Sequence, residues 1–466
     1  MFLVLKDFLT RHRLLCATAF LWWFSGAFQI FALGWIALTP FFISLHGLDR
    51  KARFRRGYAT GFFCFWLINW WLVPTISRGA PAIGASVFAG LGLSLVAVTF
   101  IAAVHAFQVA FVALFWRGSL LFRVVSAAVL WAMGDYARTL TPLAHEWGAM
   151  AFSQTSNLPF LQVAGVLGQH GITFFCVFFA ACVAVWWQSR DKKWLLAPTA
   201  LFLALHMWGG MHLAKSVEGK PLRVLVVQTA VSSLRKTGRA GGEAPFPQAF
   251  RLTSEFLSKA KEPFDLVVWP ETTANLRRFG TLYSGLDWEI WRREGPKVPL
   301  LIGAQTYDER DRSWNEAVLI APNGITQTRA KSRLVPFGER APLVEWLPFL
   351  QIFAPRPMLE AGDGAKTFDL MGKTTLDTQI CFESCFPQKV RGRLLVMLTN
   401  DEWFTGTEAP RQHRAMAIMR AVENGVPLVQ SANGGYSFAV TARGQVTMTT
   451  EFGLPQTLDT TVLVAP

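Results

Sequence analysis

One cysteine, Cys381, stands where a reactive thiol would be expected, directly after the segment Thr375–Ile380 and two residues before a carboxylate, Glu383. A thiol becomes a good nucleophile only as the thiolate, so it needs a base or a positive charge beside it. Earlier in the chain, Glu271 follows the apolar run 267–270, and Lys331 opens a turn-rich loop. These residue types predict a cysteine nucleophile with a carboxylate and an ammonium group as its partners.

The segments that would position these residues are short buried strands. Seven apolar or β-branched runs broken by turns predict them: Arg223–Gln228, Leu266–Trp269, Leu300–Gln305, Ala317–Ile320, Thr375–Ile380, Leu394–Leu398 and Leu428–Ser431. Helical patterns lie between several of these strands, notably at Phe250–Lys261 and Pro410–Asn424. Strands that alternate with helices predict a layered α/β fold, in which reactive groups lie on loops after the carboxyl ends of strands.

All three reactive residues lie in such loops. Glu271 and Cys381 each follow a predicted strand, and Lys331 opens a loop. The segment Glu383–Val390 is expected to begin a helix whose N-terminal dipole would favour a thiolate at Cys381. Taken alone, a glutamate at a strand end is most often solvated, a loop lysine is a surface charge and a buried cysteine is inert. The prediction of a site therefore depends on the three occurring together.

The first half of the chain has the composition of a membrane protein. Of the 466 residues, 52% are hydrophobic and 16% are charged, which is too apolar for an ordinary soluble protein. Runs long enough to cross a bilayer lie near 14–29, 30–48, 57–76, 84–115, 121–140, 160–187 and 193–213. We therefore expect an α-helical membrane domain of about seven spans over residues 1–213, a linker at 214–220 and an α/β catalytic domain at 221–466.

Positive charge gathers in alternate loops of the membrane half. These loops contain Lys6, Arg11 and Arg13, then Arg50, Lys51, Arg53, Arg55 and Arg56, then Arg117 and Arg123, then Arg190, Lys192 and Lys193. Cytoplasmic loops carry an excess of Lys and Arg, so the N-terminus is expected inside the cell. An odd number of spans then places the catalytic domain in the periplasm, as part of a multi-pass protein of a bacterial inner membrane. The net charge of +14 is scattered among apolar runs, which argues against nucleic acid as a partner.

The sequence offers no pattern for a metal or a cofactor. Its six cysteines form no CxxC pair and show no Cys/His ligand spacing, and no Gly-rich phosphate loop is present. We therefore expect no metal and no cofactor, and we expect a monomer.

Several motifs together are similar to those of one known family. They are Trp269–Glu271, Lys331 with Leu334–Glu339, Ile380–Glu383, Thr399–Phe404 with His413, Arg420–Glu423 and Asn433–Gly435, and, in the membrane half, Trp131–Arg138 and Pro159–Phe175. On these residues the chain resembles the apolipoprotein N-acyltransferase family, the membrane-bound branch of the nitrilase (carbon–nitrogen hydrolase) superfamily. The stretch Leu334–Glu339 is the specific part, because a Glu, Lys and Cys set alone would fit any nitrilase relative.

The resemblance implies an αββα nitrilase-like catalytic domain and a role for each reactive residue. Glu271 would be the general base, Cys381 the nucleophile, and Lys331 the cation that stabilises the oxyanion. Attack on the ester of a membrane phospholipid would leave an acyl thioester on Cys381. The N-terminal amine of a diacylglyceryl-cysteine apolipoprotein would then take the acyl chain. The implied partners are therefore a phospholipid donor, a diacylated apolipoprotein acceptor and the membrane.

The resemblance also implies supporting residues. Glu339 and Glu383 would orient Lys331 or assist proton transfer, with a structural role as the alternative for each. Trp403 and Phe404 would line the entrance for the acyl chain, with loop packing as the alternative.

The chain departs from the family pattern in three ways, the first being Thr229–Ser233, where the family usually has Gly-Asn-Ile-Pro-Gln. Two positions before Lys331, where the family usually has Tyr, stands Arg329. Members also close with a further span, whereas no apolar run of span length follows Leu398, and Leu458–Pro466 is too short. The C-terminus is therefore expected in the periplasm.

The alternative functions are a membrane-tethered amidase, in which water resolves the thioester, and a specialised acyltransferase relative, such as those of conjugative-transfer gene clusters. A non-catalytic assembly factor is a third alternative, against which the three reactive residues argue.

Overall fold

The computed structural model describes residues 12–83, 85–141, 143–232, 243–279, 282–324, 326–354 and 357–466. The chain divides into two compact units. The first comprises Met1–Arg78 and Ser86–Lys215, and the second comprises Gly79–Ala85 and Ser216–Pro466. Lys6 and Arg11, which the expected orientation uses, lie outside the described residues.

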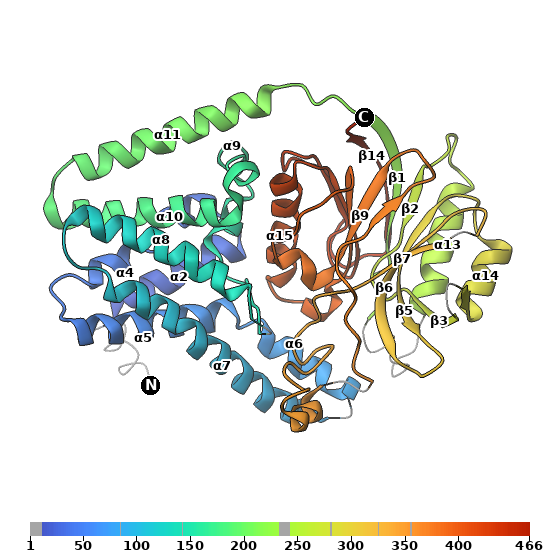
Figure 1. Ribbon diagram of the computed structural model, residues 1–466, viewed down its shortest axis with the longest axis horizontal. Helices are drawn as coiled ribbons and strands as arrows, with labels where there is room; N and C mark the ends of the chain where they lie inside the picture. The colour runs from blue at the N-terminus through green and yellow to red at the C-terminus, as the bar shows by residue number, and fades with distance from the viewer. Residues whose placement is uncertain are drawn as a thin grey trace. The chain divides into compact units, whose positions relative to one another are not determined.

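The chain up to residue 215 is helical wherever it has regular structure (Figure 1). Its helices are α2 (Arg13–Ala27), α3 (Phe31–Gly34), α4 (Thr39–Ser44), α5 (Arg50–Ile68), α6 (Leu72–Gly79), α7 (Val87–Leu114), α8 (Leu120–Arg138), α9 (Leu158–Leu161), α10 (Ala164–Ser189) and α11 (Lys193–Ala214), with the short 3₁₀ turns η1 (Ala80–Ile83) and η2 (Met150–Gln154). By length and composition, α7, α8, α10 and α11 can each cross a membrane, and α5 with α6, bent by 50°, can form a fifth span. Apolar helices of this length indicate a membrane protein.

The seven expected spans stay a prediction, and the described helices of span length account for only some of them. The run 30–48 does not form a continuous helix, because α3 and α4 are separate short helices. Pro40 lies in the first turn of α4, where its missing N–H is tolerated, although it could not continue a helix from earlier residues. The described part of α2 has 15 residues. Helices of span length in the described chain therefore number four, or five with the bent pair, against the seven predicted.

The second unit contains two β-sheets. The first has eight strands: β1 (Lys220–Gln228), β2 (Leu266–Val268), β3 (Ala274–Phe279), β4 (Leu282–Ser284), β5 (Leu300–Tyr307), β6 (Ser313–Ile320), β7 (Thr326–Ala330) and β14 (Gln456–Val464). The second has six: β8 (Thr367–Asp369), β9 (Thr375–Ile380), β10 (Leu394–Asn400), β11 (Leu428–Asn433), β12 (Phe438–Val440) and β13 (Val446–Thr449). The orders are β14-β1-β2-β5-β3-β4, with β6 beside β5 and β7 beside β6, and β13-β12-β11-β10-β9-β8.

Besides η1, the described part of this unit contains further helices and 3₁₀ turns. The helices are α13 (Pro245–Leu257), α14 (Leu286–Glu294) and α15 (Ala409–Asn424), and the turns are η3 (Pro348–Phe353), η4 (Cys381–Cys385) and η5 (Asp401–Phe404). One apolar cluster joins side chains of β1, β2, β5 and β6 to side chains of β9, β10 and β11, so the two sheets face each other across it. A second cluster packs α13 and α14 onto the first sheet, while α15 lies against β11 and η4 (Figure 1). This helix–sheet–sheet–helix layering confirms the expected α/β nitrilase-like fold.

Parallel pairing brings the loops of interest to common sheet edges. In the second sheet β9, β10 and β11 run parallel, with Ile380 opposite Leu398 and Asn400 opposite Asn433. In the first sheet β1, β2 and β5 run parallel. The carboxyl ends of parallel strands meet at the same edge of a sheet, so the loops that begin with Cys381 and Asp401 start side by side.

Candidate active site

Glu271 lies in the loop that follows β2, and this loop is held against β5. The Thr273 N–H donates to the Gly303 carbonyl at 2.7 Å, and Thr272 has a left-handed φ of 51°. A Cβ on Gly303 would lie 2.5 Å from both the Glu271 Cα and the Pro270 carbonyl oxygen, so only glycine permits this approach. The contact fixes the backbone of Glu271, which is 4% exposed.

Lys331 follows β7 and is buried between two carboxylates. Its Nζ lies 2.9 Å from Glu339 Oε1 and 3.3 Å from Glu271 Oε1. The side chain of Asn315 in β6 donates from Nδ2 to Glu271 Oε1 at 2.6 Å and to Glu339 Oε1 at 3.3 Å. The main-chain carbonyl of Asn315 accepts the Lys331 N–H at 2.7 Å. The structure therefore brings Glu271, Lys331 and Glu339 together. Asn315 was not predicted from the sequence. Its position is marked there only as a polar residue of the strand Ser313–Ile320.

Cys381 follows β9 directly, and its φ of 49° is left-handed. The predicted helix over Glu383–Val390 is wrong, because the chain makes only the five-residue 3₁₀ turn η4. Phe386 is extended, with φ −112° and ψ 141°, since a residue before proline is disfavoured in helical conformation and Pro387 follows. The expected contribution of a helix dipole is therefore lost, and charged side chains must supply the field at the thiol.

The charges of the three reactive residues act on one another. Burial raises the pKa of the Cys381 thiol, the negative charge of Glu271 raises it further, and the ammonium group of Lys331 lowers it. Burial opposes the charge of Lys331, but the carboxylates of Glu271 and Glu339 outweigh this effect and hold the pKa of Lys331 well above its ordinary value. Lys331 is therefore a fixed cation, and the resting thiol keeps its proton until a base removes it.

Glu383 pairs with Arg329. The two side chains are each 1% exposed, and the guanidinium nitrogens Nη1 and Nη2 donate to Glu383 Oε2 and Oε1 at 2.6 Å. Glu383 also accepts the N–H groups of Ser332 and Ile380, both at 2.8 Å. Burial raises the pKa of the Glu383 carboxyl, but the charge and hydrogen bonds of Arg329 outweigh burial and keep it below its ordinary value. This arrangement favours the structural alternative for Glu383, as a clamp between the loop of Lys331 and the turn of Cys381.

Trp403 and Phe404 lie in η5, after β10, and both are partly exposed. The Phe404 ring meets the imidazole of His413 edge-on, with centroids 6.3 Å apart. A Cβ on Gly79 would lie 3.5 Å from the Trp403 ring, within the same compact unit. Their expected contact with an acyl chain stays a prediction.

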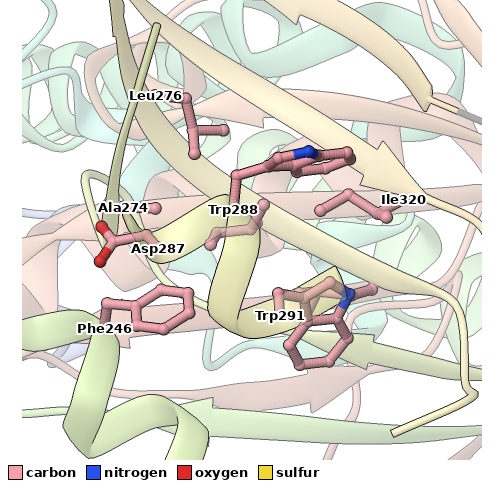
Figure 2. A pocket seen from close by; sticks show the side chains of 9 residues that line it. Phe246, Ala274, Leu276, Asp287, Trp288, Trp291 and Ile320 are labelled. Atoms are coloured by element: carbon pink, nitrogen blue, oxygen red, sulfur yellow. The ribbon is translucent and has the colours of Figure 1, made fainter. Parts of the chain in front are cut away.

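A small apolar pocket lies between the first sheet and its outer helices, lined by Phe246 of α13 and by Trp288 and Trp291 of α14 (Figure 2). Asp287 is the charged side chain in its lining, where burial raises the pKa of that carboxyl. The candidate catalytic residues do not line this pocket. Its walls belong to the cluster that holds α13 and α14 on the sheet, which gives it a packing role.

Comparison with known proteins matches both parts of the chain. The model of the apolipoprotein N-acyltransferase N-terminal domain matches residues 17–182, and the carbon–nitrogen hydrolase model matches residues 296–462. The apolipoprotein N-acyltransferase of Geobacter metallireducens is 28% identical over 89% of this chain and 82% of its own length, and that of Haemophilus influenzae is 28% identical over 92% and 86%. A solved CN-hydrolase superfamily protein from Xanthomonas campestris covers 52% of this chain and 90% of its own at 16% identity, with a TM-score of 0.36.

The layered α/β fold and the matched residues define a carbon–nitrogen hydrolase superfamily domain, joined here to a helical membrane domain. Within that superfamily, the N-terminal match separates the membrane-bound branch from other nitrilase relatives. Over most of its length the chain is similar to apolipoprotein N-acyltransferases.

Proposed function

We propose that this chain transfers an acyl chain from a membrane phospholipid, through a thioester on Cys381, to the N-terminal amine of diacylglyceryl-cysteine apolipoproteins. The carrying observation is the buried Lys331–Glu271 ion pair at 3.3 Å, whose two charges act on the partly exposed thiol of Cys381, in a chain with membrane-length apolar helices. Relatives that match most of the chain are named apolipoprotein N-acyltransferases, which supports this choice of reaction.

In the first half-reaction, Glu271 takes the proton of the Cys381 thiol, and the thiolate attacks the ester carbonyl of the phospholipid. Lys331 stabilises the oxyanion of the tetrahedral intermediate, a role that suits a buried cation held permanently charged. The protonated Glu271 then gives its proton to the leaving oxygen, which releases a lysophospholipid. Asn315 supports this role because its amide holds one oxygen of Glu271 at 2.6 Å.

In the second half-reaction, the free amine of the diacylated lipoprotein attacks the thioester carbonyl, the C–S bond to Cys381 breaks, and the proton of the amine passes through Glu271 to the Cys381 thiolate as the N-acylated lipoprotein leaves. A cysteine suits this step because amines attack thioesters more readily than oxygen esters. Both lipid substrates reside in a bilayer, so a membrane-anchored catalytic domain can meet them. We place the protein in a bacterial inner membrane with its catalytic domain in the periplasm, on the distribution of Lys and Arg among the loops.

A membrane-tethered amidase is the second candidate. The carbon–nitrogen hydrolase match favours it, because the same nucleophile, base and cation serve when water resolves the thioester. The choice between the two depends on the acceptor rather than on the residues at Cys381.

The deciding experiment supplies the purified full chain with labelled phospholipid and a diacylated lipopeptide. Mass spectrometry then locates the acyl group on Cys381 and on the amine of the peptide. We expect both to be labelled, and we expect Cys381→Ala to abolish both. If Cys381 carries the acyl group but the peptide is never acylated while free fatty acid accumulates, water resolves the thioester and acyl transfer to lipoproteins is wrong.

A further inference from the structure

A buried histidine and aspartate pair contacts Cys381, and the mechanism above gives it no role. His413 of α15 and Asp401 of η5 are both fully buried, with the ring nitrogen Nδ1 2.8 Å from Asp401 Oδ1. The other ring nitrogen, Nε2, lies 3.1 Å from the carbonyl oxygen of Cys381. Since Asp401 follows β10 and Cys381 follows its parallel neighbour β9, His413 joins the first residues of two adjacent loops.

The acceptors around the ring fix the protonation of His413. A carbonyl oxygen can only accept a hydrogen bond, so Nε2 carries a hydrogen toward Cys381. Asp401 Oδ1, which also accepts the Thr399 hydroxyl at 2.9 Å, faces Nδ1, so an ionised Asp401 requires a hydrogen there as well. With both nitrogens donating, His413 is an imidazolium.

The surrounding charges agree with this protonation. Burial lowers the pKa of His413, but the charge and hydrogen bond of Asp401, the Cys381 carbonyl and the charge of Glu271 raise it, and together they outweigh burial. These are the groups that face the ring from η5, from η4 and from the loop after β2. The pKa of His413 therefore lies above its ordinary value, which is the direction that favours the imidazolium.

A hydrogen bond at the Cys381 carbonyl has two consequences. A left-handed conformation is unfavourable for a residue with a Cβ and persists only where the surroundings hold it, and the φ of Cys381 is 49°. The site also holds three carboxylates that act on the thiol, those of Glu271, Glu339 and Asp401. A second cation beside that of Lys331 offsets part of this negative charge when the thiolate forms.

We propose that His413, held as an imidazolium by Asp401, is a positioning residue for Cys381: it fixes the carbonyl of the nucleophile turn and lowers the cost of forming the thiolate. The proposal rests on the function proposed above, in which Cys381 is the nucleophile. It adds a cation to the site that acts through the backbone of Cys381 and not on the substrate.

The test measures the reactivity of the thiol without any lipid. Iodoacetamide alkylation of the folded chain is followed at several pH values from about 7 to about 10, with the Cys381 peptide quantified by mass spectrometry, and the rate at each pH reports the thiolate fraction of Cys381. We expect His413→Gln to lower the alkylation rate of Cys381 about tenfold at each pH, as a rise of about one unit in the pKa of the thiol would, and to lower its acylation by phospholipid about tenfold. If the alkylation rate of the folded variant stays at the wild-type value, the charge of His413 does not act on the thiol and the proposal fails.

A second variant covers the case in which His413→Gln does not fold. Asp401→Asn removes the carboxylate that keeps the ring charged, so the pKa of His413 falls and the imidazolium is lost at neutral pH. Lowering the pH restores it. We therefore expect the acylation rate of Asp401→Asn, relative to wild type, to rise as the pH falls from about 8 to about 6, whereas a pH-independent ratio contradicts the proposal.

Thr399→Val is the matched control, because it removes a hydrogen bond to Asp401 and changes no charge. We expect it to lower thermal stability and to leave the alkylation rate of Cys381 at the wild-type value; a decrease as large as that of His413→Gln would assign the effect to packing. The alkylation result is independent of the proposed reaction. If wild-type Cys381 never accepts an acyl group but His413→Gln still lowers the alkylation rate, the proposed function fails and this inference stands.

Discussion

Breaking the ion pair between Arg329 and Glu383 is expected to destabilise the catalytic domain and to displace the loop of Lys331. The pair is bidentate at 2.6 Å, and both side chains are 1% exposed. Arg329 stands two residues before Lys331, and Glu383 stands two residues after Cys381. Removing one partner of a buried pair leaves the other charge uncompensated, which costs about 3–5 kcal/mol.

The two substitutions, Glu383→Gln and Arg329→Met, differ in the hydrogen bonds that the remaining groups keep. In Glu383→Gln, an amide NH₂ group replaces one carboxylate oxygen. If it replaces Oε1 it faces the Ser332 N–H, and if it replaces Oε2 it faces the Ile380 N–H, so in either case two donors meet and one hydrogen bond is lost. In Arg329→Met, the carboxylate keeps both of these donors. We therefore expect about 5 kcal/mol for Glu383→Gln and about 3 kcal/mol for Arg329→Met. At roughly 2–4 °C per kcal/mol, Glu383→Gln lowers the Tm by roughly 10–20 °C.

The assay is thermal unfolding of the purified chain in detergent, followed by circular dichroism. Arg251→Met is the matched control, because its pairs with Glu243 and Glu255 lie on the exposed side of α13, and we expect no measurable change in Tm. Acyl-enzyme formation at a temperature where each variant is folded then reports the position of Lys331. If Glu383→Gln has the same Tm as the Arg251→Met control, the Arg329–Glu383 pair does not stabilise the fold and the reasoning is refuted.

The same pair predicts a pH dependence. The pKa of Glu383 in the folded protein lies below its ordinary value, because Arg329 and the N–H donors outweigh burial. A carboxyl with a lowered pKa contributes stability that is present above its unfolded pKa, about 4.3, and is lost as the pH falls through the folded value. Wild-type Tm is therefore expected to fall in this acid range, and Glu383→Gln is expected to lack that part of the decrease.

Three further outcomes test the site and the membrane orientation. Glu271→Gln is expected to lower acylation of Cys381 by about 100-fold or more, because the amide cannot take the thiol proton, and near-normal acylation measured by mass spectrometry would remove Glu271 from the mechanism. Asn315→Ala is expected to lower the same rate by about tenfold, since Glu271 loses a hydrogen bond at 2.6 Å, and an unchanged rate would make Asn315 a structural residue only. A reporter fused after Pro466 is expected to be active only if it works in the periplasm, and a cytoplasmic signal would contradict the orientation.

The central strands were predictable from the sequence, and the edge strands were not. The predicted strand Leu394–Leu398 lies within β10, because a strand buried between parallel neighbours, here β9 and β11, reads as a short apolar run. The strand β14, Gln456–Val464, pairs antiparallel with β1 along its whole length, yet its Thr-rich sequence buries only alternate residues. The signal used for the central strands is absent there. The pairing itself depends on two segments from opposite ends of the domain.

The residues of the candidate active site also differ in how visible they are in the sequence. Glu271 and Cys381 were found because a reactive residue directly after a strand is visible along the chain. Asn315 and His413 contact them only through strand register and helix packing, which sequence spacing does not report.

Glu383 shows why closeness along the chain misleads. Standing two residues after Cys381, it would be the natural partner of the thiol, but the turn η4 directs its carboxylate back to the Ile380 N–H and across to Arg329. The family pattern has Tyr where this chain has Arg329. A neutral phenol there could donate only one hydrogen bond to Glu383, whereas the guanidinium donates two and neutralises the charge. We infer that in this chain Glu383 is committed to the clamp, so the proton chemistry at Cys381 is left to Glu271.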